Sequence, residues 1–303
     1  MKPVHILYAA IVAFLWGSNY LAIKIGLEYF QPYMLLTLRF ILVLAMLMPF
    51  YPRPPLPFLN ILVLSLVLGF GHFVMIYEGM AQGLDVASTI IAAQLNVPFS
   101  CALATVFFKD RLGPWRSFGM MVSFFGIILI VGSPSVSAHL GAFSLVMAGA
   151  MGWAITNIML KRQQAVSMLA LLPWLSLFLI PQMALFTWLF EAESLVNFTL
   201  PWQAAASVVY TAIGSTLIAF GLWHYLLQRY EVSQVAPFTL LVPVFGIGIG
   251  QLFMGGALAT PVLVGGLVTL LGVGIITVRK PRLATFDEDA PGTIEEDNKG
   301  DAA

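Results

Sequence analysis

The chain alternates between long apolar runs and short polar breaks. Each run has about twenty residues, which is enough for a helix to cross the roughly 30 Å hydrocarbon core of a bilayer. Proline, glycine and clustered charges separate the runs and predict ten membrane spans with short loops. The expected spans are 4–27, 32–51, 59–81, 86–107, 113–132, 140–160, 168–190, 202–227, 232–254 and 261–278.

Composition agrees with this pattern. Of 303 residues, 60% are hydrophobic and only 9% are charged, whereas a soluble domain carries about a quarter charged residues. Seven of the 14 acidic residues fall after position 286, in a segment that lacks apolar periodicity. We therefore expect 281–303 to be a disordered acidic tail.

Lysine and arginine are distributed unevenly between the two sets of loops. Alternate loops hold nearly all of them, and the opposite loops hold none, with Lys24 close to that side. Cytoplasmic loops are enriched in these residues, so both termini are expected in the cytoplasm. The basic residues on the expected cytoplasmic side, up to position 282, are Lys2, Arg53, Lys109, Arg111, Arg116, Lys161, Arg162, Arg229, Arg279, Lys280 and Arg282.

The second half of the chain repeats features of the first. Because five spans is an odd number, the two halves must enter the membrane from opposite sides, as in inverted-repeat transporters whose substrate site lies at the repeat interface. We predict an all-α membrane protein with a first repeat at 1–135 and a second at 136–280. The matching positions are Trp16 and Trp153, Val97-Pro98 and Val242-Pro243, Gly119 and Gly265, and Gly126 and Gly272.

Several strings resemble a known family. WGSNYLAIKIGL from residue 16, LRF from 38, FFKDRL from 107 and RYEVSQVAPFTLLVPVFG from 229 resemble the EamA family of the drug/metabolite transporter superfamily. The last string is particularly similar to bacterial O-acetylserine/cysteine exporters. The resemblance implies ten helices, a location in the cell inner membrane, and export of amino acids or related metabolites.

Ionisable side chains inside spans are expensive to bury and are therefore candidates for function. Arg39, about eight residues into the second span, can bind a substrate carboxylate with its two-pronged guanidinium; a structural ion pair or an interfacial anchor is the alternative. Lys24 and Glu78 lie at a similar depth. They are candidates for an outer gate in which they pair with each other or with Arg39, and Glu78 is also a candidate proton carrier. For Lys24 the alternative is snorkelling to the headgroups.

Proline marks corresponding points in spans 4 and 9. Pro98 and Pro243 each remove a backbone donor, which is predicted to free the carbonyl of Gln94 and of Thr239 one turn earlier. With Asn96 beside Pro98, these groups are expected to line a cavity. A packed kink is the alternative.

Other polar and aromatic positions complete the candidate set. Two mid-span tryptophans are each followed one turn later by an amide side chain: Trp16 by Asn19, and Trp153 by Asn157. An indole beside an amide suits a largely apolar pocket. Helix packing is the alternative for both. His72 lies in mid-span, and span 8 carries a stripe of small and polar residues that includes Tyr225. His224 lies beside that stripe and is assigned to gating or coupling.

No motif for nucleotide hydrolysis, metal binding or nucleophilic catalysis is present, and no basic patch predicts nucleic-acid binding. No cofactor or metal is expected, and the chain is not expected to be an enzyme. The sequence favours a secondary transporter that exports a small zwitterionic metabolite by alternating access in a bilayer, with protons as a possible coupling ion. Broad efflux of hydrophobic compounds is the first alternative, and a lipid-acting integral-membrane enzyme is a weaker one.

Overall fold

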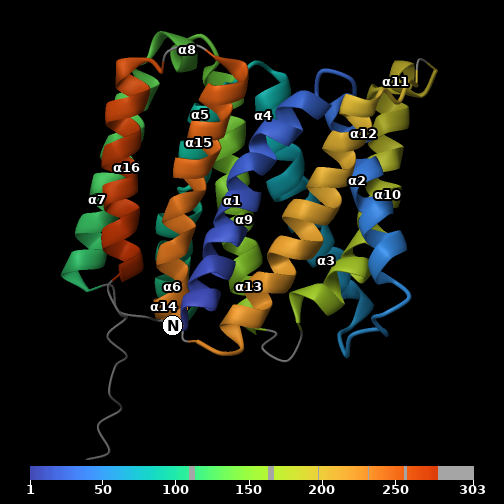
Figure 1. Cartoon of the computed structure of the whole chain (residues 1–303), viewed down its shortest axis with the longest axis horizontal. Helices are drawn as coiled ribbons and strands as arrows, with labels where there is room; N and C mark the ends of the chain where they lie inside the picture. The colour runs from blue at the N-terminus through green and yellow to red at the C-terminus, as the bar shows by residue number, and fades with distance from the viewer. Residues whose placement is uncertain (109–112, 163–166, 197, 231, 256–257, 279–303) are drawn as a thin grey trace, which may run out of the picture.

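We analysed a computed structural model of the chain, which describes residues 1–108, 113–162, 167–196, 198–230, 232–255 and 258–278. The described part is built from helices (Figure 1). The first half contains α1 (Pro3–Gly26), α2 (Pro32–Leu47), α3 (Phe58–Leu68), η1 (Gly69–Val74), α4 (Met75–Ala81), α5 (Val86–Ala93), α6 (Asn96–Phe108) and α7 (Pro114–Val131). The second contains α8 (Pro134–Ser137), α9 (Leu140–Arg162), α10 (Met168–Phe190), α11 (Ala192–Val196), α12 (Trp202–Val209), η2 (Tyr210–Ile218), α13 (Ala219–Leu227), α14 (Val232–Val235), η3 (Ala236–Leu240), α15 (Leu241–Met254) and α16 (Thr260–Val278).

The expected membrane spans correspond to helical segments. Within the described residues, nine helical segments are long and apolar enough to cross a membrane. The expected span at 32–51 is instead the shorter helix α2. Met48 still has helical geometry, with φ −55° and ψ −38°, but Pro49 has no backbone N–H with which to continue the hydrogen-bond pattern, which accounts for the early end. The FFKDRL hairpin at 109–112 and the acidic tail at 281–303 lie outside the described residues.

The outer surface suits a lipid environment. Met121, Leu252 and Phe253 are more than two-thirds exposed, which would be unfavourable in water but matches the hydrocarbon of a bilayer. The chain is a multi-pass helical membrane protein.

The two ends of the bundle differ in charge. Figure 1 shows the start of α1 and α14 at one end, and α4, α8 and α11 at the other. Four further segments lie on the same side of the bundle as the start of α1. They are the α2–α3 connection, the first residues of α7 and the last residues of α9 and of α13. We call this the basic end, because Lys2, Arg53, Arg116, Arg162 and Arg229 lie on those segments. The opposite end carries the acidic residues of the described segments, Glu28, Glu78, Asp85, Glu191 and Glu193.

Two pairs of matching spans, one from each half, pack against each other. Helix α2 packs on α10, and α7 packs along α16. A β-carbon added to Gly126 would lie 2.6 Å from the carbonyl oxygen of Gly265, and one added to Gly119 would lie 2.8 Å from that of Gly272. Only glycine allows backbones to approach so closely.

Four spans are irregular near their middle. In spans 3 and 8, the π-helical segments η1 and η2 interrupt the α-helix. In span 4 the helix breaks between α5 and α6, and span 9 passes through the 3₁₀ segment η3 before α15 begins. Such irregular backbone at membrane depth is tolerated where it is buried in protein or lines a cavity, and these four segments all contribute to the cavity described next.

Candidate substrate-binding site

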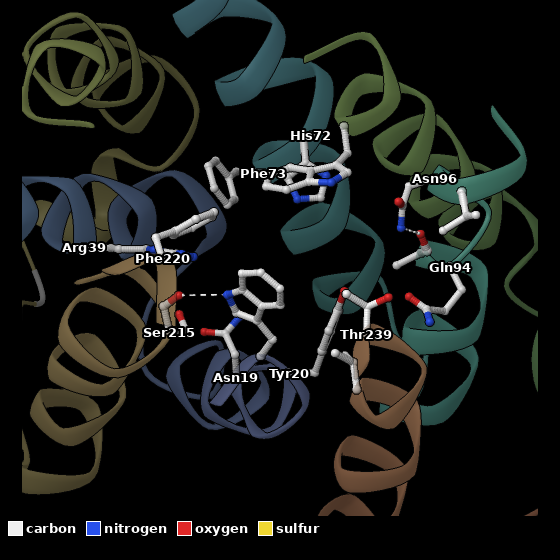
Figure 2. Close-up of a pocket in the computed structure, with 15 residues that line it drawn as sticks. Asn19, Tyr20, Arg39, His72, Phe73, Gln94, Asn96, Ser215, Phe220 and Thr239 are labelled. Atoms are coloured by element: carbon white, nitrogen blue, oxygen red, sulfur yellow. Dashed lines mark hydrogen bonds between the residues drawn. The ribbon is translucent and has the colours of Figure 1, made fainter. Parts of the chain in front are cut away.

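A cavity of about 180 Å³ lies inside the bundle (Figure 2). A single water needs about 10–15 Å³ on this measure, so the cavity has room for a small organic solute. Eight of the ten binding residues expected from the sequence line it, whereas Asn157 and Tyr225 do not. The lining residues are Trp16, Asn19, Tyr20, Arg39, His72, Phe73, Ala93, Gln94, Asn96, Val97, Trp153, Ser215, Phe220, Thr239 and Val242.

Arg39 is the charged side chain in the cavity wall. It is 3% exposed. Its Nη1 donates to the hydroxyl of Tyr77 at 2.9 Å, and its Nη2 donates to Oγ1 of Thr216 at 2.8 Å. The guanidinium carbon lies 4.7 Å from the centroid of the Phe73 ring. Both partners are neutral hydroxyls, and no carboxylate among the described residues forms an ion pair with Arg39.

Three polar atoms in the cavity wall are buried without a hydrogen-bond partner. They are Nε of Arg39, Oδ1 of Asn19 and Nε2 of Gln94. Buried polar atoms are nearly always satisfied, and leaving one unpaired costs about 1–3 kcal/mol. Two of these atoms are donors and one is an acceptor, so a solute with complementary groups could satisfy them once the side chains turn toward the cavity.

The charged group lies toward one side of the cavity, and the described residues on the opposite side carry only neutral polar groups. Figure 2 shows Arg39, Ser215 and Asn19 toward one side and Gln94, Asn96 and Thr239 toward the other. An elongated solute would therefore meet the guanidinium with one end and neutral hydrogen-bonding groups with the other.

Aromatic rings form much of the wall between these two sides. Nε1 of Trp16 donates to the backbone oxygen of Ser215 at 3.2 Å, which fixes its indole against the ring of Phe220 at 5.5 Å between centroids. The ring of His72 lies 4.8 Å from that of Trp153. His72 also donates through Nδ1 to the backbone oxygen of Gly149 at 2.9 Å, because a carbonyl can only accept. These contacts hold the rings as rigid walls.

Four functional-site candidates in the cavity were missed by the sequence analysis. Tyr20 lies one turn beyond Trp16, and Ser215 lies one turn beyond Thr211, another polar residue of span 8, so helical spacing could have found both. Phe73 and Phe220 are apolar residues in apolar spans, and nothing in their sequence context separates them from core residues.

The prediction about freed carbonyls needs correction. The Gln94 carbonyl accepts a hydrogen bond from the N–H of Val97 at 3.1 Å, because the chain forms a tight turn at the break between α5 and α6. The N–H of Leu241 is likewise directed at the carbonyls of Phe238 and Thr239. Pro98 and Pro243 thus follow helix irregularities that satisfy the backbone, and it is the side chains of Gln94 and Thr239 that line the cavity.

The expected outer-gate residues do not come together. Glu78 accepts a long hydrogen bond from Gln82 at 3.4 Å, Lys24 lines a separate pocket with Asp85, and Arg39 bonds only neutral groups. The three expected pairings are therefore absent from the described structure. His224 lies within 2.9 Å of Nε2 of Gln228 and away from the cavity.

Tyr225 belongs to an aromatic cluster near the basic end. Its ring lies 5.7 Å from that of His5, and the guanidinium carbon of Arg229 is 3.6 Å from its centroid. Its role is therefore packing in this structure.

Glu191 was not singled out from the sequence, yet it is 3% exposed. Directly after α10, its carboxylate accepts hydrogen bonds from the N–H groups of Tyr33 at 2.9 Å and Met34 at 2.8 Å. It therefore caps α2, the helix that carries Arg39, where a negative charge is favourable. Burial raises the pKa of Glu191, the two N–H groups lower it, and the charge of Glu78 raises it further.

A helical membrane protein with a central cavity that mixes one buried cation with aromatic and amide groups is organised as a small-molecule transporter. The sequence model of the EamA-like transporter family matches the chain twice, over residues 4–132 and 140–278. The chain belongs to the EamA-like transporter family, which confirms the resemblance drawn from its motifs and makes it a transporter rather than an enzyme.

Similar proteins support this assignment. A protein of Salmonella typhimurium, named as a probable amino-acid metabolite efflux pump, is 29% identical over 88% of this chain and 92% of its own length. An Escherichia coli protein with the same description is 28% identical over the same shares. A solved crystal structure, 16% identical, matches 92% of this chain and 98% of its own with a TM-score of 0.63, which shows the shared fold.

Proposed function

We propose that the protein is a secondary-active transporter of the cell inner membrane that exports amino acids or related zwitterionic metabolites. The observation that carries this proposal is the Arg39 guanidinium in the wall of the central cavity, buried without a carboxylate partner among the described residues. The two relatives named as probable amino-acid metabolite efflux pumps support the substrate class.

The physical argument begins with the cost of an unpaired buried charge. Placing arginine at the centre of a membrane helix costs about 2.5–3.5 kcal/mol on insertion scales. Tyr77 and Thr216 offset part of this cost, but each supplies only a neutral oxygen. A guanidinium has five N–H donors, of which two are used here. A solute carboxylate would complete the set and supply the missing negative charge.

The ammonium group of the solute has a partner close to that carboxylate. Oδ1 of Asn19 is an unpaired acceptor on the Arg39 side of the cavity, and the Trp16 ring adds an electron-rich face suited to a cation. The α-carboxylate and α-ammonium of an amino acid are adjacent, so one solute can meet both. Its side chain would then extend toward Gln94 and Thr239, which favours a polar, ester- or amide-bearing side chain.

Alternating access is the proposed mechanism. The family model matches each half of the chain, the glycine faces of α7 and α16 pack reciprocally, and π-helical segments interrupt spans 3 and 8 alike. We take these as support for two inverted five-span repeats, at 1–135 and 136–280, that rock against each other around the cavity. By the positive-inside rule, the proposed orientation has the basic end facing the cytoplasm and both termini on that side.

Proton coupling completes the proposal, with Glu78 and His224 as the candidate groups. Its test compares export with and without a pH gradient in inverted vesicles, where export is measured as uptake of the solute into the vesicle. Export that ignores the gradient would leave facilitated diffusion as the mechanism.

The Arg39→Gln variant tests the central claim in proteoliposomes loaded with a labelled amino acid. Losing charge-assisted hydrogen bonds worth about 1.5–3 kcal/mol should lower transport about ten- to hundredfold. Arg53→Gln is the matched control, because Arg53 is an exposed arginine on the connection after the same helix. Equal transport by Arg39→Gln and the control would contradict the proposal.

Broad efflux of hydrophobic compounds remains the second candidate, and the aromatic wall formed by Trp16, Trp153 and Phe220 favours it. The two functions differ in their dependence on solute charge. Hydrophobic efflux predicts that a lipophilic amine is exported equally well by Arg39→Gln, whereas amino-acid export predicts that only zwitterions are moved.

A further inference from the structure

A second pocket of about 320 Å³ lies at the end of the bundle opposite the basic end. Lys24 of α1 and Asp85, the residue before α5, contribute the charged groups of its wall. Gly83, Val86, Ala87, Ile247, Gly250, Gln251, Met254 and Gly255 complete the lining.

This pocket continues the faces of three helices that also line the central cavity. On α1, Lys24 lies one turn beyond Tyr20. On α5, Val86 lies two turns before Ala93, and on α15, Gly250 lies about two turns beyond Val242. Residues at these spacings share one face of a helix. Because α1, α5 and α15 pack against one another, the pocket is in line with the cavity along their common axis.

Ile90 of α5 and Gly246 of α15 each lie between a residue that lines the pocket and one that lines the cavity. Ile90 is 1% exposed, and its Cδ1 lies 2.5 Å from where a β-carbon on Gly246 would be. Gly246 also packs against Gly17, whose carbonyl oxygen would lie 2.8 Å from the same β-carbon. Parting these contacts would join the pocket to the cavity without unfolding a helix.

The two charges in the pocket have unused bonding capacity. Lys24 makes no hydrogen bond or ion pair with the described residues. Asp85 uses Oδ1 to accept from the N–H of Ser88 at 2.8 Å, which leaves its other oxygen available. Lys24 and Asp85 are thus opposite charges in one pocket that are not paired with each other. Lys24 matches the carboxylate of a zwitterion, and Asp85 matches its ammonium group.

We infer that this pocket is a vestibule that binds the zwitterionic head of an amino acid between Lys24 and Asp85 on its way past Ile90 and Gly246. The inference rests on the proposed transport of zwitterions. It adds a second, weaker binding site outside the Arg39 cavity. Because both charges are partly exposed, each contributes the small energy of a surface pair, equivalent to about a two- to fivefold change in affinity.

The test measures occupancy of the vestibule directly by thiol labelling. In a Cys101→Ser background, Gln251→Cys is labelled by a membrane-impermeant maleimide in intact cells, with Met254→Cys as a second reporter. L-Alanine should slow labelling, while propionate, which lacks the ammonium, and ethylamine, which lacks the carboxylate, should each protect several-fold less well. Equal protection by all three, or no protection by L-alanine at either reporter, would overturn the inference.

Charge variants assign the two groups and separate this inference from the proposed function. Asp85→Asn should make L-alanine no better than propionate, and Lys24→Gln should make it no better than ethylamine. Arg39→Gln should lower transport about ten- to hundredfold and leave protection at the vestibule intact. Protection that survives both vestibule variants would overturn the site, whereas intact transport by Arg39→Gln would overturn the central-cavity proposal alone.

Discussion

Ser123 and Thr269 form a reciprocal pair at the contact between α7 and α16. The hydroxyl of each lies 3.4 Å from the backbone oxygen of the other, and 146 residues separate them. The same offset relates Gly119 to Gly265 and Gly126 to Gly272. Mutual contacts between equivalent residues are expected where a two-fold axis passes between them. This reciprocal contact supports the proposed relationship between the two halves.

The glycines around this pair predict a large effect on stability. Gly126→Leu would push a side chain against the carbonyl oxygen of Gly265 and the N–H of Thr269, and backbone cannot yield as a flexible side chain can. Overpacking costs about 1–3 kcal/mol or more. We expect the Tm in detergent to fall by several degrees. Gly248→Leu is the control, since nothing lies within 4 Å of its added β-carbon, and an equal loss there would refute this explanation.

The sequence was sufficient for the helical membrane fold and for much of the cavity lining, because spans, repeats and buried polar residues leave local signals. Arg39, Asn19 and Gln94 stand out in apolar spans for that reason. Tertiary partners leave no such signal. The bonds of Arg39 to Tyr77 and Thr216 join residues far apart in the chain, and the capping role of Glu191 depends on α10 ending beside the start of α2. Helical spacing alone could not reveal either.

The neutral partners of Arg39 should tune substrate affinity. Tyr77→Phe and Thr216→Val each remove one hydrogen bond to the guanidinium and free it to leave its transport-competent position. We expect the half-saturation constant for amino-acid transport to rise roughly three- to tenfold for each, consistent with hydrogen bonds of about 1 kcal/mol. Ser65→Ala removes a hydroxyl that accepts a hydrogen bond from Gln182, outside the cavity. A similar rise in that control would show a general packing effect.

Gln94 should show opposite effects on stability and on function. Its Nε2 is buried without a hydrogen-bond partner in the cavity wall, so Gln94→Leu removes an unsatisfied donor whose burial costs about 1–3 kcal/mol. The variant should be as stable as the native protein or more stable, with a Tm raised by a few degrees. It should also bind substrate more weakly, because a polar solute loses a donor. A loss of stability together with unchanged transport would refute the assignment of Gln94 to the site.

Glu191 predicts a pH dependence of stability. Because burial raises its pKa above the ordinary value of 4.5, the folded protein binds this proton more tightly than the unfolded chain does. Its contribution to stability is therefore largest at acidic pH and is lost as the pH rises through the raised pKa. The Tm of the native protein minus that of Glu191→Gln, which cannot ionise, should fall over the same interval.

The exposed neighbour Glu193 provides a matched control, because Glu193→Gln removes a carboxylate from the same segment but neither of the hydrogen bonds from Tyr33 and Met34. Glu191→Ala should lose the cap on α2 altogether, at a cost of about 0.5–2 kcal/mol. Since α2 carries Arg39, that variant should also transport more slowly at every pH. A native Tm that rises relative to Glu191→Gln as the pH increases would reverse the sign and show that the two N–H bonds outweigh burial.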